Sequence, residues 1–234
     1  MSSLYLTQLH IDQPRLMRFA ADQGLLRHSD EGFGYILHAW MKALFGNLAP
    51  KPFRFFERNH QVLGYGCGDQ SVLSEQAQRF ASPMAYQALV LDSLATKPMP
   101  LGWPKGKQLQ MEVLACPVTR KDQEEKDVYL HAVERLGDAA PPRAEVYRQW
   151  FLRQVGPAAE VRDLQLLGYG RRHLLRRAEV PGGERRLRSV ERPEALFLAR
   201  IEIHDGEAFQ RLLERGVGRH RAFGFGMVLL RPAG

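Results

Sequence analysis

Three side chains near the amino end combine groups that can move protons and offset negative charge. Tyr35, His38 and Lys42 are spaced at i, i+3 and i+7, which places them together on one face of a helix. An imidazole titrates near neutral pH and can give or take a proton, and a nearby ammonium group can stabilise an anion. The same grouping occurs on ordinary solvated helix faces, so the spacing alone leaves a purely structural role open.

The helix that must carry these side chains is predicted from residue 30 to residue 45, with Asp30 as its N-cap. Its apolar residues recur at helical spacing and form one continuous face: Phe33, Ile36, Leu37, Trp40, Met41, Leu44 and Phe45. The three polar side chains lie roughly 120–180° from the centre of that face. We therefore expect His38 to face outward. His28, in the turn before the helix, is the alternative candidate for the histidine that transfers a proton.

The composition is that of a globular protein of two small domains. The chain has 234 residues, 44% hydrophobic and 25% charged, with a net charge of +7. It contains no apolar run of membrane-spanning length and no apparent signal peptide, so we expect a soluble, cytoplasmic protein without a membrane partner. Cys67 and Cys116 lack the spacing of metal ligands, which argues against a structural zinc site.

The positive charge is concentrated between residues 171 and 192, a segment that we call the arginine hairpin. Eight arginines and three acids give it five of the seven net positive charges. Pro181-Gly182-Gly183 at its centre predicts a turn between two strands, 173–180 and 185–190. Clustered guanidinium groups favour the recognition of phosphate and nucleic acid. The alternative is a solvated surface with arginines lying over apolar neighbours.

The order of predicted elements favours an α+β fold of two tandem ferredoxin-like (βαββαβ, RRM-like) domains. The first domain, residues 1–100, contains the helix that carries His38, and the second, residues 107–234, contains the arginine hairpin. Residues 12–29 are unassigned apart from a short helical turn at 15–19. The other expected elements are strands at 4–11, 53–57, 61–65, 108–118, 161–168, 195–203 and 227–230, helices at 71–80 (N-cap Ser71), 143–155 and 207–215, and a linker at 96–106.

A glycine-rich loop, residues 216–226, precedes the last predicted strand. Its glycines follow a helix and lead into a strand, whereas a dinucleotide-binding loop follows a strand and opens a helix. The loop amides could face phosphate oxygens, with Arg219 and Arg221 adding charge. The alternative is a helix C-cap and a simple connection.

Three motifs resemble the CRISPR repeat-processing endoribonucleases, in particular the CasE-type enzymes of type I-E systems or a divergent type IV relative. The glycine-rich loop has their Gly–hydrophobic–Gly, five residues, then Gly–Phe–Gly, at Gly216, Gly218, Gly224 and Gly226. The first strand, LYLTQLHI, opens the chain as theirs does. Residues 35–38 (Tyr-Ile-Leu-His) are similar to the segment that carries their catalytic histidine.

The resemblance implies metal-independent cleavage of RNA, in which the 2′-hydroxyl attacks the adjacent phosphorus and leaves a 2′,3′-cyclic phosphate. His38 would be the acid or the base, Tyr35 would orient the nucleophile or bind the phosphate, and Lys42 would offset the developing charge. The predicted RNA-binding residues are Arg171, Arg172, Arg176, Arg177, Arg185, Arg186, Arg188, Gly216, Gly218, Arg219, Arg221, Gly224 and Gly226.

The expected partners are the stem-loop of a CRISPR repeat RNA and the other subunits of an effector complex, with the cleaved product remaining bound. No cofactor and no metal are implied. The arginine hairpin is poor in aromatic residues, which suits a paired stem recognised by shape and phosphate. The main alternative is a non-catalytic RNA-stem-binding subunit of the same complex. A DNA-binding regulator would need a recognition helix that the sequence does not display.

Overall fold

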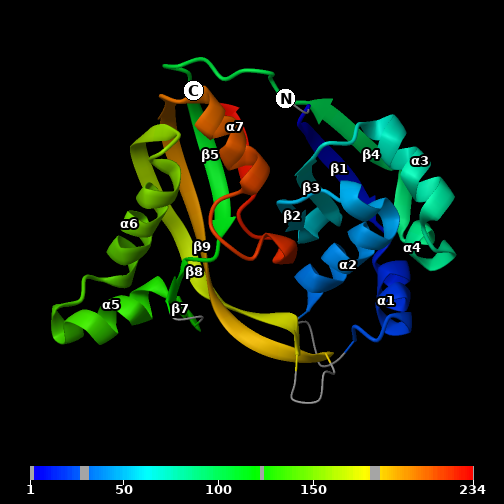
Figure 1. The fold of residues 1–234 in the computed structure, drawn as a ribbon, viewed down its shortest axis with the longest axis horizontal. Helices are drawn as coiled ribbons and strands as arrows, with labels where there is room; N and C mark the ends of the chain where they lie inside the picture. Colours follow the sequence, from blue (N-terminus) through cyan, green and yellow to red (C-terminus); the bar gives the residue numbers. More distant parts are fainter. Residues whose placement is uncertain (1–2, 27–31, 122–123, 180–184, 234) are drawn as a thin grey trace. The chain divides into compact units, whose positions relative to one another are not determined.

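The computed structural model describes residues 3–26, 32–121, 124–179 and 185–233. The backbone separates into two compact units, whose elements are labelled in Figure 1. The first unit comprises residues 1–101, 173–191 and 222–224, and the second comprises residues 102–172, 192–221 and 225–234. Much of the arginine hairpin and three residues of the glycine-rich loop therefore cluster with the amino-terminal part of the chain. The sequence-based division placed both segments in the second domain.

The first unit is built on a four-stranded sheet with the order β2-β3-β1-β4. Its neighbouring strands are antiparallel, with Thr7 of β1 opposite both Gly64 of β3 and Thr96 of β4. The elements of this unit are β1 (Tyr5–Ile11), α1 (Gln13–Asp22), α2 (Phe33–Phe45), η1 (Gly46–Leu48), β2 (Phe53–Phe56), η2 (Glu57–Asn59), β3 (Gln61–Gly66), α3 (Gln70–Phe80), α4 (Pro83–Gln87) and β4 (Leu89–Pro98).

One hydrophobic core joins the helices of this unit to its sheet. Leu16 and Phe19 of α1, Trp40 of α2 and Leu73 of α3 are buried in it with β-strand residues such as Leu9. Trp40 also donates a hydrogen bond from Nε1 to the backbone oxygen of Ala85, 2.9 Å away. The predicted apolar face of α2 is therefore the face that enters the core.

Three predictions about helix starts are corrected. The segment left unassigned forms α1, because the Asp12 carboxylate accepts a hydrogen bond from the Arg15 amide and Pro14 is tolerated in the first turn. Helix α2 begins at Phe33 after Gly32, without a side-chain cap. Asp30 lies outside the described residues. Helix α3 is capped by Asp69, not by Ser71.

The predicted linker at residues 96–106 is also shorter than expected. Residues 96–98 belong to β4, where Pro98 pairs with Tyr5 of β1. Proline is compatible with this position because β4 is an edge strand and Pro98 is its last residue. The connection between the two sheets therefore begins at Met99.

The second unit repeats the topology of the first. Its sheet has the spatial order β10-β5-β9-β8. Counted along the chain, the first and third strands of this sheet (β5 and β9) lie in its centre and the second and fourth (β8 and β10) at its edges, as in the first unit. This arrangement confirms the α+β fold of two tandem ferredoxin-like units. The elements of this part of the chain are β5 (Gln108–Ala115), β6 (Val118–Lys121), β7 (Glu124–Asp127), α5 (Val128–Leu136), η3 (Gly137–Ala139), α6 (Arg143–Val155), β8 (Ala159–Glu179), β9 (Arg185–Ile203), α7 (Gly206–Arg215), η4 (Arg221–Phe223) and β10 (Val228–Pro232). The parts of β8, β9 and η4 within residues 173–191 and 222–224 cluster with the first unit.

Strands β8 and β9 are much longer than predicted. The sequence analysis separated a strand at 161–168 from the first strand of the arginine hairpin, but the two form one strand, β8. Its neighbour β9 likewise continues without interruption from the hairpin into Ala195–Ile203, where alternate side chains are buried. Figure 1 shows the two strands running side by side.

Strands β6 and β7 and helix α5 are additions between β5 and α6, and the sequence analysis did not predict them. β6 and β7 pair as a small antiparallel sheet with Arg120 opposite Glu125. Asp127 then caps α5 by accepting a hydrogen bond from the Tyr129 amide, 2.8 Å away. Among the described residues, no helix is long and apolar enough to span a membrane.

Candidate active site

Helix α2 presents the three predicted catalytic side chains outside the set of fully buried core residues, although Tyr35 packs against the edge of the core. Its buried residues are Ile36, Leu37, Trp40, Met41, Leu44 and Phe45. Tyr35 and His38 are half-buried, and Lys42 is exposed. The helical periodicity therefore predicted the correct face, although His38 is more enclosed than an outward-facing residue would be.

The environment of His38 favours its neutral form. Its Nδ1 atom is buried and has no hydrogen-bond partner among the described residues. Nε2 is not among the buried atoms that lack a partner. The pKa of His38 is lowered from its ordinary value, first by burial and then by the positive charges of Lys51 and Lys42. At neutral pH the imidazole is therefore uncharged and can accept a proton.

Lys51 is a candidate site residue that the sequence analysis missed. Its charge affects His38 more than that of Lys42, whose ammonium group donates a hydrogen bond to Asn47 Oδ1, 3.1 Å away. The backbone of Lys51 is held against β3, because its amide donates to the Tyr65 carbonyl at 2.8 Å. Lys51 lies beyond the end of α2, so helical spacing could not associate it with His38.

The tip of the glycine-rich loop packs on α2 within the first unit. The Phe223 and Tyr35 rings are stacked, with centroids 6.0 Å apart and planes inclined by 26°. A Cβ atom on Gly34 would overlap the backbone carbonyl of Phe223, so this close approach requires glycine. The structure thus brings Phe223 next to the helix that carries His38.

This contact gives a first testable prediction. We expect Gly34→Ala to displace Phe223 and, if the chain has the RNA-cleaving activity that the family resemblance implies, to lower its rate about 10²-fold, since small displacements at an active site carry large kinetic costs. Alanine is a better helix former than glycine by about 1 kcal/mol, so a weakened α2 would not explain the loss. Gly102→Ala, where nothing lies within 4 Å, is the matched control. An unchanged rate for Gly34→Ala in single-turnover assays would contradict the prediction.

The glycines of the loop have structural functions. Gly218 has φ of +77°, and a Cβ there would come within 2.8 Å of the Trp150 ring. Gly226 has φ of +79°, and its amide donates to the Leu114 carbonyl at 2.7 Å. The Gly216 amide donates to the Leu212 carbonyl at the end of α7. The amides of Gly216 and Gly226 are therefore directed at protein carbonyls, and the loop's charged side chains are better candidates for phosphate contacts.

The two arginines of the loop are both engaged by the second unit. Arg219, whose side chain is 49% exposed, places Nε 2.5 Å from Glu125 Oε1. Arg221 donates from Nη1 to the carbonyl of Arg215, 2.6 Å away. Glu125 Oε1 has no hydrogen-bond partner among the described residues, so Arg219 is held there by charge, whereas Arg221 is oriented by a hydrogen bond. The Arg219 side chain remains partly accessible.

The arginine hairpin is described only in part. Arg171 and Arg172 are exposed on β8, and Arg172 Nε lies 2.7 Å from Glu194 Oε2. The remaining predicted RNA-binding arginines belong to β8 and β9, and their side chains lie outside the described residues: Arg176, Arg177, Arg185, Arg186 and Arg188. The same holds for the alternative histidine, His28.

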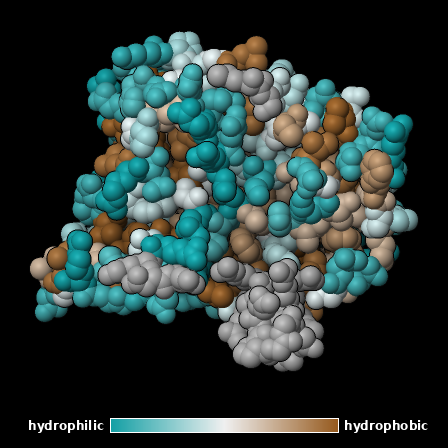
Figure 2. Space-filling view, viewed as in Figure 1, coloured by the Kyte–Doolittle hydropathy of each residue, from teal (hydrophilic) through white to brown (hydrophobic). Residues whose placement is uncertain are grey.

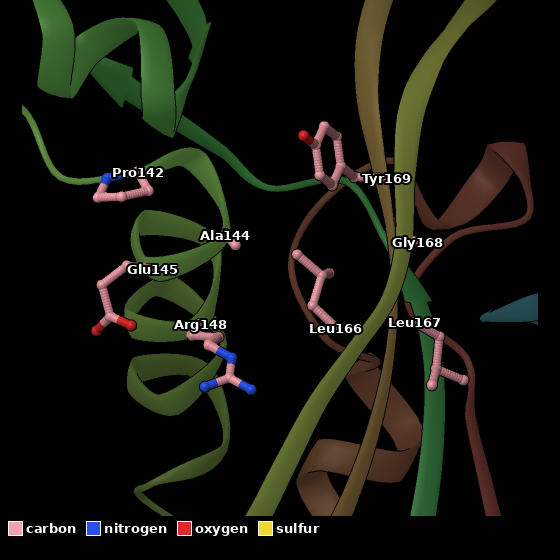
Figure 3. Close-up of a pocket in the computed structure, with 8 residues that line it drawn as sticks. All are labelled: Pro142, Ala144, Glu145, Arg148, Leu166, Leu167, Gly168 and Tyr169. Atoms are coloured by element: carbon pink, nitrogen blue, oxygen red, sulfur yellow. The ribbon is translucent and has the colours of Figure 1, made fainter.

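A separate groove of about 620 Å³ lies in the second unit between α6 and β8. Figure 3 shows Arg148 of α6 and Leu166 and Tyr169 of β8 at its walls, and Figure 2 shows hydrophobic residues among hydrophilic ones over α5 and α6. Arg148 donates to the Leu164 carbonyl at 2.8 Å, so its charge is engaged by the protein. None of the predicted site residues lines this groove.

In the described part of the chain, no three His, Cys, Asp or Glu side chains gather as a metal site would require.

Comparison with known proteins places the fold among solved structures. A CRISPR endoribonuclease, Cse3, bound to a 19-nucleotide RNA matches with a TM-score of 0.64 at 18% identity, covering 98% of this chain and 100% of that one. Cas6e from Escherichia coli K-12 matches with a TM-score of 0.57 at 18% identity over the same shares of the two chains. A chain of a CRISPR RNA-guided surveillance complex matches with a TM-score of 0.55 at 16% identity, over 98% and 100%.

These similarities confirm the tandem ferredoxin-like fold. No curated protein matches the sequence. The model of the family described as CRISPR associated protein matches residues 4–232, nearly the whole chain. This match confirms the resemblance carried by the strand, helix and loop motifs, and the chain belongs to the CRISPR associated protein family.

Proposed function

We propose that this chain is an endoribonuclease that cleaves the repeat hairpins of CRISPR transcripts. The observation that carries the proposal is the half-buried His38 with its lowered pKa, on the helix against which Phe223 of the glycine-rich loop packs. The family match supports a role in a CRISPR system. The similar Cse3 structure is an endoribonuclease bound to RNA, which supports this substrate and this class of reaction.

In the proposed reaction, neutral His38 removes the proton from the 2′-hydroxyl next to the scissile phosphate. The 2′-oxygen forms a bond to phosphorus, the bond from phosphorus to the 5′-oxygen breaks, and that oxygen takes up a proton that water can supply. The products are a 2′,3′-cyclic phosphate and a 5′-hydroxyl. We assign the role of base to His38 because its lowered pKa keeps it unprotonated at neutral pH.

The neighbours of His38 have complementary roles in this proposal. Lys51 and Lys42 offset the negative charge that develops on the phosphorane, and charge stabilisation of this kind is commonly a large contribution to catalysis. Tyr35, held by its stacking on Phe223, orients the nucleophile or hydrogen-bonds the phosphate. The step requires no metal ion, because all its proton transfers and charges are assigned to these side chains and water.

The arginine hairpin, Arg219 and Arg221 bind the RNA stem through its phosphates. Since a paired stem is recognised mainly by shape and backbone, a protein that grips it in this way can remain bound after the strand is cut. The similarity to a chain of an RNA-guided surveillance complex supports membership of an effector complex. We therefore propose that the chain keeps its product and carries it into such a complex.

The proposal is tested by incubating the purified protein with a labelled repeat hairpin in EDTA. The hairpin is chosen by sequencing the RNA that co-purifies with the protein. We expect a product with a 2′,3′-cyclic phosphate, identified by its resistance to phosphatase until acid opens the ring. Tight binding without cleavage would instead identify a non-catalytic RNA-stem-binding subunit. Cleavage that EDTA abolishes would contradict the metal-independent mechanism.

Replacing Lys51 tests the assignment of this residue. We expect Lys51→Ala to slow cleavage about 10–100-fold, because charge stabilisation is lost. The rate should rise with pH as His38 loses its proton, with a midpoint below that of an ordinary histidine in the unaltered protein, because burial and the charges of Lys51 and Lys42 lower the pKa. Removing the Lys51 charge should move this midpoint upward, and Lys42→Ala should move it less, because Lys42 is the smaller cause. Equal midpoints for Lys51→Ala and the unaltered protein would contradict the assignment.

A further inference from the structure

Three cationic or potentially cationic side chains converge on a single carboxylate, that of Glu125. Its Oε1 lies 2.5 Å from Arg219 Nε, and its Oε2 lies 2.6 Å from His220 Nε2 and 3.3 Å from Arg192 Nε. All four residues belong to the second unit. Two of the three partners, Arg219 and His220, are consecutive residues of the glycine-rich loop, so this carboxylate holds the loop by two adjacent side chains.

The carboxylate is buried and ionised. The Glu125 side chain is only 9% exposed. Burial alone would raise its pKa, but the hydrogen bond with His220 and the charges of His220, Arg219 and Arg192 outweigh burial and lower the pKa to about 2. A buried charge that is matched in this way is costly to leave unpaired, so the loss of one member disturbs the others.

The element that supplies Glu125 is an addition to the ferredoxin-like topology. Strand β7 belongs to the small β6–β7 sheet, inserted between β5 and α6. The insertion is tied to the end of β5, where the Val118 amide donates to the Cys116 carbonyl and the Val128 amide to the Pro117 carbonyl. A βαββαβ unit closes its sheet without such an insertion. In this chain, the insertion supplies the carboxylate that contacts Arg219 and His220 of the glycine-rich loop.

The backbone of His220 also indicates that its side chain is needed where it is. His220 has φ of +62°, a left-handed conformation that costs free energy for a residue other than glycine. Glycine would adopt this conformation without strain, and the loop uses glycine at its other left-handed positions, such as Gly218. The short contact between the imidazole and Glu125 accounts for a histidine at this position.

We propose that Glu125 is a positioning residue for RNA binding: it holds Arg219 and His220 so that the glycine-rich loop presents the Arg219 guanidinium to a phosphate of the RNA. This inference rests on the proposed function, because it assumes that RNA is the ligand. Glu125 itself does not contact RNA in this proposal.

Whether Glu125→Gln weakens or strengthens RNA binding distinguishes this proposal from an effect of net charge alone. Removing an acid from a basic surface should strengthen the binding of RNA if only the net charge matters. We expect Glu125→Gln to weaken the binding of the co-purifying repeat hairpin about tenfold, because Arg219 loses its orientation. The matched control is Glu134→Gln, which breaks the exposed ion pair with Lys126 near the same insertion and should leave affinity unchanged.

A double-mutant cycle tests whether Glu125 acts through Arg219. In an Arg219→Ala background, Glu125→Gln should weaken binding by less than about twofold, because the group that it positions is already absent. A full tenfold additional loss would overturn the proposal, as would unchanged or tighter binding by Glu125→Gln in the otherwise unaltered protein. If Glu125→Gln melts well below the unaltered protein, the proposal is tested with His220→Asn instead. Asparagine tolerates the left-handed backbone at this position but lacks the imidazole that contacts Glu125. Weaker binding by this variant supports the proposal, and unchanged binding overturns it.

Failure of the proposed function would be recognised separately. If the unaltered protein neither binds nor cleaves the hairpin, the function is wrong and the Glu125 measurements have no ligand to report on. If the unaltered protein binds and cleaves while Glu125→Gln behaves identically, the function stands and the positioning role of Glu125 is excluded.

Discussion

Replacing His38 by alanine is expected to slow RNA cleavage by about 10²–10⁴-fold, the usual contribution of a general base. Binding of the hairpin should remain within about twofold of the unaltered protein, because the proposed phosphate-binding arginines lie in other segments. The reason is specific to this imidazole, which is kept neutral by burial and by Lys51 and Lys42 at the pH where cleavage is measured. Single-turnover cleavage at saturating protein, together with filter binding at the same pH, separates the two effects.

The appropriate control is another histidine on a helix. His131 belongs to α5 and has no proposed part in the chemistry, so His131→Ala should cleave at the unaltered rate. His28→Ala tests the alternative histidine and should also retain activity. If His38→Ala cleaves RNA at the unaltered rate and His28→Ala cleaves it slowly, the role of base belongs to His28. Weak binding by His38→Ala would show that the residue contributes to affinity instead of chemistry.

The second large effect is expected from the arginine hairpin. Replacing Arg171, Arg172, Arg176 and Arg177 together by alanine should weaken hairpin binding about 10²-fold at low salt, if each exposed contact contributes somewhat less than 1 kcal/mol. The dependence of the binding constant on salt should also become shallower, since each lost phosphate contact reduces the number of counterions released by about one. Titrations at several salt concentrations measure both quantities.

A matched set of four arginines checks that net charge alone is not responsible. Arg79, Arg135, Arg153 and Arg211 are exposed and lie on helices α3, α5, α6 and α7. Their combined replacement by alanine removes the same charge and should leave the salt dependence nearly unchanged. If both sets weaken binding equally, the arginine hairpin is not the RNA-binding surface. If neither does, RNA is bound elsewhere on the chain.

Local patterns in the sequence predicted a large part of the fold. Helix α6 has the predicted bounds, Arg143–Val155, and the apolar residues of α2 are the ones that enter the core. The β2–β3 hairpin and the closing strand β10 also lie near their predicted positions. These elements were predictable because helical and strand periodicities are properties of neighbouring residues.

The errors arose where competing local signals were weak. Pro14 and Gly24 obscured α1, although Asp12 and Pro14 in fact begin it. Helix α5 and the β6–β7 sheet were missed because they are short additions to a regular fold, with nine residues in α5 and four in each strand. Capping by Asp69 instead of Ser71 is a shift within a single turn, the scale on which sequence patterns discriminate poorly.

By itself, the sequence determined that a helix ends at Phe45, which of its faces is polar and where the positive charge is concentrated, because each depends on residues close together in the chain. Only the tertiary structure decided that Phe223 stacks on Tyr35, that the charge of Lys51 acts on His38 and that Glu125 holds Arg219 and His220. These relations join segments that the chain brings together only when its sheets and core have formed. Periodicity reports which way a side chain faces, but the groups that it meets are selected by packing.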